Sequence, residues 1–323
     1  MARDKTIYAK ARRILASFFI IGITLLFLDF TGSIHAWLGW MAKIQFLPAL
    51  MALNVVVVII LIAMTLLFGR IYCSVICPLG VMQDGISWLS GLMKKKKYRF
   101  SYSAEVKWLR YAVLAVFIVA IIAGIGSVVA LLAPYSSFGR IVSNLFAPIY
   151  QWGNNVLAYW SERKGSYAFY ETDIWIKSLP TFIIAATTFI VLCILAWKNG
   201  RTYCNTICPV GTMLGLLSRF SLFRIVIDEN KCNRCGLCYR KCKASCINGK
   251  EHRIDYSRCV VCMDCISTCN HGAIHYKLRT PGKAKTETSD KISGSDVISR
   301  RNFLSTTAVI AAGALLKAQE KNR

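Results

Sequence analysis

Apolar residues gather along this chain into four long blocks, and the segments between the blocks carry most of the charge. An α-helix needs about 20 apolar residues to cross the hydrocarbon core of a bilayer. Lipid offers no hydrogen-bond partner to an open backbone, so helices are the expected spans. The pattern therefore predicts a mainly α membrane protein with four transmembrane helices, at Ile14–Phe30, Ala49–Phe68, Leu109–Leu132 and Leu179–Trp197.

Basic residues mark one side of these blocks. They crowd the N-terminus, the segment from Lys94 to Lys97 and the region after the fourth block, whereas the loop at 31–48 has only Lys43. The loop at 134–178 nearly balances four basic against three acidic residues. By the positive-inside rule, both termini lie in the cytoplasm. We therefore expect a multi-pass protein of the inner (cytoplasmic) membrane, surrounded by membrane lipid.

The composition agrees with a membrane protein. Of the 323 residues, 55% are hydrophobic and 17% are charged. The formal net charge of +24 would also suit a nucleic-acid-binding protein, but no groove-reading or base-stacking motif accompanies the charge. We expect no nucleic-acid partner.

Eight of the fourteen cysteines form two runs with the same C-x2-C-x2-C-x3-C spacing. A cytoplasmic compartment keeps thiols reduced, so this many cysteines indicates metal binding. The spacing is that of bacterial two-cluster ferredoxins, in which the fourth cysteine of a run ligates the other cluster. The sequence therefore predicts two [4Fe–4S] clusters. Cluster 1 would be held by Cys232, Cys235, Cys238 and Cys269, and cluster 2 by Cys259, Cys262, Cys265 and Cys242.

The segment around the two runs is itself a repeat. Ile227-Asp228 before the first run corresponds to Ile254-Asp255 before the second, at the same offset that separates Cys232 from Cys259. Short strands are expected at 223–227 and 253–255, and Asn248-Gly249 suits a hairpin turn. A small α+β two-cluster ferredoxin domain is predicted at 221–280.

A second repeat lies in the apolar part of the chain. Residues 69–82 (GRIYCSVICPLGVM) match residues 200–213 (GRTYCNTICPVGTM) at nine of fourteen positions. Each copy follows a predicted span and carries a Cys-x3-Cys-Pro motif, whose proline suits the first position of a helix. Residues 1–220 are therefore predicted to form a four-helix transmembrane domain of two repeated hairpins, with both motifs on the cytoplasmic side.

The motif cysteines Cys73, Cys77, Cys204 and Cys208 supply four thiols. The preferred interpretation is that they ligate a further cluster or another redox metal, with Arg70 and Arg201 offsetting its negative charge. Two dithiol/disulfide pairs or a purely structural turn are alternatives, because thiolate character and exposure decide cysteine chemistry.

With these motifs, residues 10–280 resemble the NapH-type membrane polyferredoxin family, whose relatives include the C-terminal half of NosR and the FixG/CcoG proteins. The resemblance implies a quinol-dehydrogenase membrane component, which passes electrons between the quinone pool and a ferredoxin-like or cytochrome partner. The chain departs from the usual ferredoxin pattern at Lys243 and Asn270, where proline commonly follows the fourth cysteine of a run.

The chain has further cysteines and two candidate quinone residues outside these motifs. Cys246 and Cys193 are interpreted as small buried residues, although Cys246 is also a possible substitute ligand for Cys242. Asp29 and His35 are candidate acceptors of quinol protons at the membrane surface. The alternative is that Asp29 caps the end of the first span and that nearby tryptophans form an aromatic belt.

The end of the chain carries a separate signal. A polar linker at 281–298 precedes a tail at 299–323, in which Ser299-Arg300-Arg301-Asn302-Phe303-Leu304 resembles a twin-arginine export signal. We favour a relic of a fused exported domain over a short interfacial tail.

Two other functions are compatible with these features. The FixG/CcoG resemblance allows a copper reductase or maturation factor for a respiratory oxidase, which predicts copper reduction without quinone dependence. A redox-sensing regulator predicts clusters that turn over slowly with any donor. Cluster potentials span about −700 to +450 mV, so the direction of electron flow is not set by the ligands alone.

Overall fold

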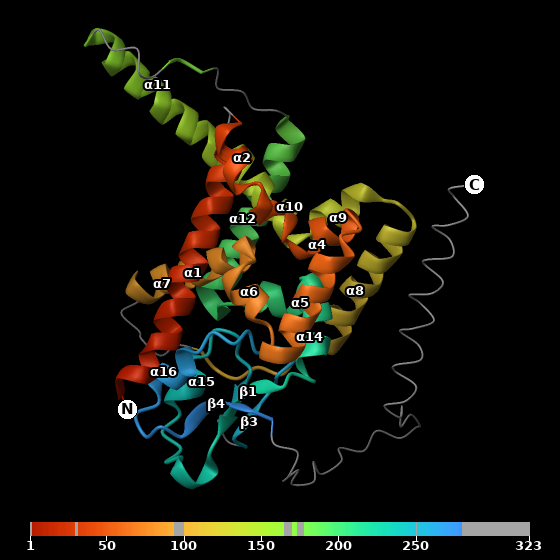
Figure 1. Cartoon of the computed structure of the whole chain (residues 1–323), viewed down its shortest axis with the longest axis vertical. Helices are drawn as coiled ribbons and strands as arrows, with labels where there is room; N and C mark the ends of the chain where they lie inside the picture. Colours follow the sequence, from red (N-terminus) through yellow and green to blue (C-terminus); the bar gives the residue numbers. More distant parts are fainter. Residues whose placement is uncertain are drawn as a thin grey trace. The chain divides into compact units, whose positions relative to one another are not determined.

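Helices make up most of this chain in its computed structural model, and the short strands lie toward the end of the described residues (Figure 1). The structure describes residues 2–29, 32–93, 100–164, 170–172, 178–249 and 251–279. The predicted linker at 281–298 and the twin-arginine-like tail at 299–323 lie outside these residues.

Within the described residues, two helices are long and apolar enough to cross a membrane: the part of α1 (Ala2–Leu28) from Ile7 to Leu28, and α12 (Leu179–Asn199). The second predicted block is divided at Leu53, which has a positive φ of 52°, into α4 (Phe46–Met51) and α5 (Val55–Phe68). The third block is divided at Gly124, with a φ of 69°, into α8 (Lys107–Ile122) and α9 (Gly126–Leu132). The architecture of four spans therefore stays a prediction.

The helices of all four blocks expose large apolar side chains. Exposed apolar side chains in such numbers are typical of a surface that contacts a membrane or another protein. The exposed side chains include Ile14, Phe18 and Ile21 on α1, Val56 and Ile59 on α5, Val119 and Ile122 on α8, and Ile183, Ile190 and Ile194 on α12.

The remaining helices of the apolar part are α2 (Ser33–Leu38), α3 (Trp40–Lys43), α10 (Pro134–Ile141), the π-helix η1 (Val142–Phe146) and α11 (Ala147–Arg163). Helix α10 packs against α12, and η1 continues directly into α11.

The Cys-x3-Cys-Pro repeat has the same local structure in both copies. A short helix, α6 (Ile71–Val75) or α13 (Thr202–Thr206), is followed by a longer one, α7 (Pro78–Met93) or α14 (Pro209–Ser218). The prediction that each motif proline begins a helix is confirmed. The preceding helices α5 and α12 end at Gly69 and Gly200, whose φ angles of 79° and 72° favour glycine.

The cysteine-rich segment has two small antiparallel sheets. Strand β1 (Phe223–Ile227) pairs with β4 (Ile274–Leu278), and β2 (Ile247–Asn248) pairs with β3 (Arg253–Ile254). The 3-10 turn η2 (Glu229–Lys231) precedes two short helices, α15 (Leu237–Lys241) and α16 (Asp264–Thr268), which begin at equivalent positions of the two cysteine runs. The expected strand at 223–227 is confirmed. The turn expected at Asn248-Gly249 begins one residue later, because Asn248 pairs with Arg253 as the last residue of β2, and the strand expected at 253–255 ends at Ile254.

The cysteine-rich segment packs directly on the ends of the helices. The Leu222 backbone N–H donates to the Leu66 carbonyl at 2.8 Å, and the Tyr276 hydroxyl donates to the Phe68 carbonyl at 2.9 Å. The rings of Phe68 and Phe223 stack with centroids 5.8 Å apart. Residues Met1–Arg279 therefore form one compact unit, and the expected domain boundary at residue 220 is crossed by many contacts.

Candidate metal centres

The first cavity in the cysteine-rich segment is lined by Cys232, Cys235, Cys238 and Cys269. These are the four residues that the spacing assigns to cluster 1, three from the first run and one from the second. Cys235 is exposed to solvent, and the other three are half-buried. This cavity therefore lies at the surface.

The second cavity is lined by Cys242, Cys259, Cys262 and Cys265, the set that the spacing assigns to cluster 2. It also contains a fifth thiol, that of Cys246. Cys242, Cys262 and Cys265 are buried, and burial raises the pKa of the Cys262 thiol well above its usual value. Metal ligation would stabilise these sulfur atoms as thiolates, which burial alone disfavours.

The loops around the two cavities share an unusual backbone conformation. Left-handed φ angles occur at three pairs of equivalent positions in the two runs: Arg234 and Val261, Gly236 and Met263, and Ser245 and Gly272. Turns of this kind direct backbone N–H groups into a concavity that binds anions. The Ala273 N–H, for example, donates to the Cys269 Sγ at 3.3 Å. Both cavities thus combine four thiols with N–H donors to sulfur, as an iron–sulfur cluster requires.

The four motif cysteines form a third group at the ends of α5 and α12. Cys73, Cys77, Cys204 and Cys208 are each only 4–5% exposed. The pKa of Cys208 is raised well above its usual value by burial and then by the charges of Cys204, Cys77 and Cys73. The pKa of Cys204 rises to about 11, through burial and the charge of Cys73, against the lowering effect of Arg201 and Arg70. The two repeats therefore bring their four thiols into one electrostatically coupled site, which we call the four-cysteine site.

Within the described residues, no three His, Cys, Asp or Glu side chains are close enough to hold a single metal ion. This holds for the four-cysteine site and for the two cysteine-lined cavities alike.

Two buried arginines cross between the repeats at the four-cysteine site. The Arg201 guanidinium donates to the Cys73 carbonyl at 2.6 Å, and the Arg70 guanidinium donates to the Cys204 carbonyl at 3.3 Å. These contacts are equivalent in the two copies of the motif. Arg70 also lies 3.9 Å from the Cys73 Sγ, and the Gln83 amide donates to the Cys204 Sγ at 3.3 Å. The site is therefore surrounded by donors and positive charge, as an anionic cluster requires.

Glycine is required at one position of each motif helix. A Cβ at Gly80 would collide with the Cys73 carbonyl, and a Cβ at Gly211 would collide with the Cys204 carbonyl. The Gly211 N–H donates to the Cys208 Sγ at 3.4 Å. The backbone of α14 thus packs closely on that of α13 at Gly211, and the N–H of the same glycine donates to the thiol of Cys208.

Asp84 lies in the first repeat and has no carboxylate counterpart at the equivalent position of the second repeat. Its two oxygens accept from Arg201 at 2.8 Å each, and it also pairs with Arg12 at 3.0 Å and Lys243 at 3.8 Å. Burial would raise the pKa of Asp84, but Arg201, Lys243 and Arg12 outweigh it and hold the pKa far below its usual range. Sequence reasoning missed this residue, although a lone carboxylate inside an otherwise uncharged helix at the membrane edge was a detectable signal.

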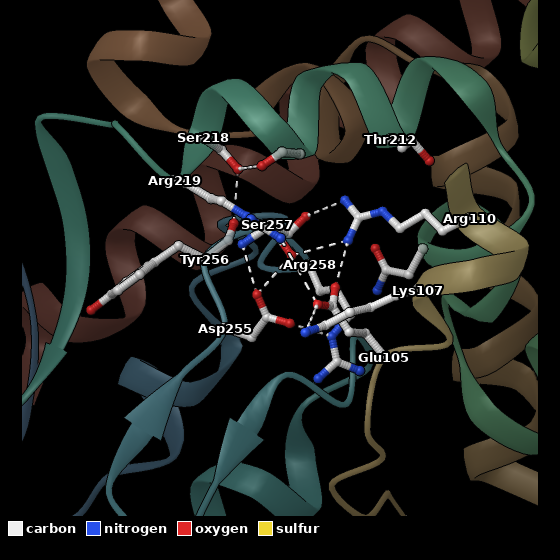
Figure 2. Close-up of polar contacts among 12 residues, drawn as sticks. Glu105, Lys107, Arg110, Thr212, Ser218, Arg219, Asp255, Tyr256, Ser257 and Arg258 are labelled. Carbon is white, nitrogen blue, oxygen red and sulfur yellow. Dashed lines mark hydrogen bonds and ion pairs between the residues drawn. The ribbon is translucent and has the colours of Figure 1, made fainter. Parts of the chain in front are cut away.

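The equivalent position in the second repeat is Gly215, and a buried arginine lies against it. The Arg110 guanidinium donates to the Ser257 carbonyl at 3.0 Å and to Glu105 at 3.1 Å (Figure 2). A Cβ at Gly215 would collide with the Arg110 guanidinium. The first repeat therefore has a carboxylate, that of Asp84, at the position where the second repeat has Gly215 with the Arg110 guanidinium packed against it.

These networks connect the four-cysteine site to the second cavity. Arg70 donates to the Ser257 carbonyl at 2.9 Å, close in sequence to Cys259. On the other side, the Asn205 amide donates to the Ala244 carbonyl at 3.2 Å, and the Arg201 backbone N–H donates to the Lys243 carbonyl at 2.9 Å. Lys243, which replaces the usual proline, follows Cys242. Both repeats thus contact the loops of the second cavity.

The candidate quinone residues Asp29 and His35 are joined through the backbone. The Asp29 carboxylate accepts from the backbone N–H groups of Gly32 and His35, each at 2.9 Å. These bonds stabilise the first turn of α2, whereas the alternative offered by the sequence was a cap at the end of the first span. The neighbouring Trp37 side chain is 84% exposed, as an interfacial residue would be. A role for Asp29 and His35 in proton transfer stays a prediction.

Comparison with known proteins identifies iron–sulfur relatives. A family model described as a 4Fe-4S binding domain matches twice, at residues 50–97 and 180–227. Each match contains one Cys-x3-Cys-Pro motif. An uncharacterized protein of Methanocaldococcus jannaschii is 35% identical over 104 residues, which is 32% of this chain and 42% of the relative.

Other relatives have descriptive names, among them NapH and NosR. The ferredoxin-type protein NapH of Haemophilus influenzae is 27% identical over 65% of this chain and 60% of its own length. The regulatory protein NosR of Stutzerimonas stutzeri is 24% identical over 64% of this chain and 24% of its own length. The chain thus spans less than two thirds of the length of each of these three relatives. No solved structure matches the chain.

Proposed function

We propose that this chain, an iron–sulfur protein of the ferredoxin type related to NapH and NosR, passes electrons between a membrane quinone and a partner redox protein. The proposal includes four membrane spans with the cysteine-rich segment in the cytoplasm. The exposed apolar faces of α1, α5, α8 and α12 and the positive-inside pattern support this placement.

The contact between the four-cysteine site and the second cavity is the observation that carries the proposal. Arg70 binds the Ser257 carbonyl near Cys259, and Arg201 binds the Lys243 carbonyl beside Cys242. The first cavity lies farther toward solvent, with Cys235 exposed. Electrons would therefore step between the four-cysteine site, cluster 2 and cluster 1, and cluster 1 would face the partner protein.

The residues of this route have separate proposed roles. The ferredoxin-type cysteines hold two [4Fe–4S] clusters, and Cys73, Cys77, Cys204 and Cys208 hold a third. Such clusters supply one-electron steps when they are bound. Arg70 and Arg201 offset thiolate charge at the four-cysteine site, while Asp84 fixes Arg201. Asp29 and His35 are the proposed acceptors of quinol protons, although Asp29 also caps backbone N–H groups.

The match of a 4Fe-4S model to both Cys-x3-Cys-Pro regions favours a cluster over a dithiol or a structural turn at the four-cysteine site. It does not separate a quinol-linked carrier from a copper reductase or a redox-sensing regulator. The name of the NosR relative says that it is regulatory, so the test has to measure electron flow.

The test is low-temperature EPR of the protein purified without oxygen, before and after addition of a reduced menaquinone analogue. New signals of reduced clusters, lost in a Cys73→Ala/Cys204→Ala variant, are the expected result. No response to quinol, together with full reduction by dithionite, would overturn the quinone role. Cupric ion added to the reduced protein is the parallel assay, and rapid quinone-independent copper reduction would favour the maturation-factor function.

A further inference from the structure

The second cavity is lined by five thiols, although a [4Fe–4S] cube takes four thiolates. We propose that Cys246 is a reserve ligand of cluster 2, which takes the place of Cys242 when that ligand is lost. The inference rests on the proposed assignment of Cys242, Cys259, Cys262 and Cys265 to this cluster.

Cys246 lies where a substitute ligand needs to be. Its Sγ is 3.5 Å from the Cys242 Sγ, and its side chain is 1% exposed. The thiol shares its cavity with Cys259 of the other run. Cys246 therefore lies beside one proposed ligand of cluster 2, within the same cavity and shielded from solvent.

The internal symmetry of the segment shows that a thiol is not needed here for packing. The alignment of the two runs pairs Cys242 with Cys269, and Cys246 with Ala273. Ala273 is also 1% exposed, and its N–H donates to the Cys269 Sγ at 3.3 Å. The Cys246 N–H makes the same kind of bond to Cys242. Since alanine fulfils the structural role at cluster 1, the sulfur atom at residue 246 is an addition specific to cluster 2.

The exchange requires no oxidant or reductant. In the exchange, the bond from iron to the Cys242 sulfur would break, the bond from iron to the Cys246 sulfur would form, and the proton of the Cys246 thiol would pass to the released Cys242 thiolate. Where Cys242 is replaced by alanine, the Cys246 thiol would release its proton to solvent when it binds the iron. The charge of the ligand set and the number of electrons are unchanged. The Sγ–Sγ distance of 3.5 Å allows the proton to pass directly between the two sulfur atoms.

A reserve ligand would matter more at cluster 2 than at cluster 1, because of the place of cluster 2 on the proposed route. In the proposed route, cluster 2 connects the four-cysteine site to cluster 1, so its loss would interrupt all transfer. Cluster 1, which has the exposed Cys235, has alanine at the equivalent position.

The test compares iron content, labile sulfide and the EPR of the dithionite-reduced full chain, purified without oxygen in detergent. Cys242→Ala is expected to keep the iron content of the unmodified protein. Its matched control, Cys269→Ala, is expected to lose about four irons, since it has no neighbouring thiol. Cys242→Ala/Cys246→Ala is expected to lose the same amount, and Cys246→Ala alone to lose none.

A folded Cys242→Ala protein that loses as much iron as the double variant would overturn the proposal. If Cys242→Ala does not fold, the transplant Cys269→Ala/Ala273→Cys decides. It is expected to regain the roughly four irons that Cys269→Ala loses, and failure to regain them would overturn the proposal. Absence of both ferredoxin-type clusters from the unmodified protein would instead disprove the proposed function.

Discussion

Arg201 and Asp84 form a buried bidentate ion pair, in which the guanidinium Nε and one Nη donate to the two carboxylate oxygens at 2.8 Å each. The pair connects the second motif to the helix that follows the first. It also anchors Lys243 of the cysteine-rich segment, 3.8 Å away. One carboxylate thus holds three parts of the chain together.

Asp84→Asn is expected to destabilise the protein strongly. The change leaves Arg201, Arg12 and Lys243 without their shared anion, and removing one partner of a buried ion pair costs about 3–5 kcal/mol. Thermal unfolding in detergent should show a large decrease in Tm, together with loss of iron. The control is Glu229→Gln, since Glu229 is exposed. Equal Tm values for the two variants would contradict the anchoring role.

Gly80→Ala and Gly211→Ala are each expected to disrupt the four-cysteine site. The added methyl group would collide with the Cys73 or the Cys204 carbonyl, and overpacking of this kind costs about 1–3 kcal/mol. Gly91→Ala in the same helix as Gly80 is the matched control, because a Cβ there has no atom within 4 Å. Iron content should fall in the first two variants and stay unchanged in the third.

Arg70→Gln is expected to lower the reduction potential of the cluster proposed at the four-cysteine site. Reduction adds negative charge, and Arg70 lies 3.9 Å from the Cys73 Sγ. A decrease of about 60 mV would correspond to about 1.4 kcal/mol for a one-electron couple. Potentiometric EPR titration measures the change. The exposed Arg253 provides the control, Arg253→Gln, and an equal shift in both variants would show that the effect is not local.

The proposed order of the clusters can be tested at two equivalent cysteines. Cys235 and Cys262 are each the second cysteine of their run but line different cavities. Cys235→Ala removes a proposed ligand of cluster 1. A reduced quinone analogue should still reduce cluster 2 in this variant, because electrons would reach cluster 2 before cluster 1. In Cys262→Ala, cluster 1 should respond to dithionite and no longer to quinol. Rapid reduction of cluster 1 by quinol in Cys262→Ala would show that electrons take another route.

Local signals in the sequence predicted local structure well. The spacing of the cysteines identified the residues that share each cavity, and the repeat around the two runs placed β1 at Phe223–Ile227. The motif prolines Pro78 and Pro209 begin helices as expected, because a proline at the first helical position sacrifices no intrahelical hydrogen bond. The role of each cysteine as a ligand remains to be measured.

Longer-range features could not be read from the sequence. The crossing of Arg70 to Cys204 joins residues 134 positions apart, and periodicity contains no information about such contacts. The interruption of two apolar blocks at Leu53 and Gly124 was also unexpected. Asn54 beside Leu53 caps α5 by accepting from the Val57 N–H at 3.3 Å, a helix-start signal that the apolar pattern alone does not include. A single glycine such as Gly124 is tolerated in many helices.

The contact of Arg70 with Ser257 has a consequence for the order of assembly during synthesis. The two residues are 187 positions apart, and loop closure over such a distance is slow compared with local helix formation. The first motif therefore leaves the ribosome long before its arginine can reach this partner. The hydrogen-bonded surroundings of the four-cysteine site are therefore complete only after nearly the whole described chain has been translated.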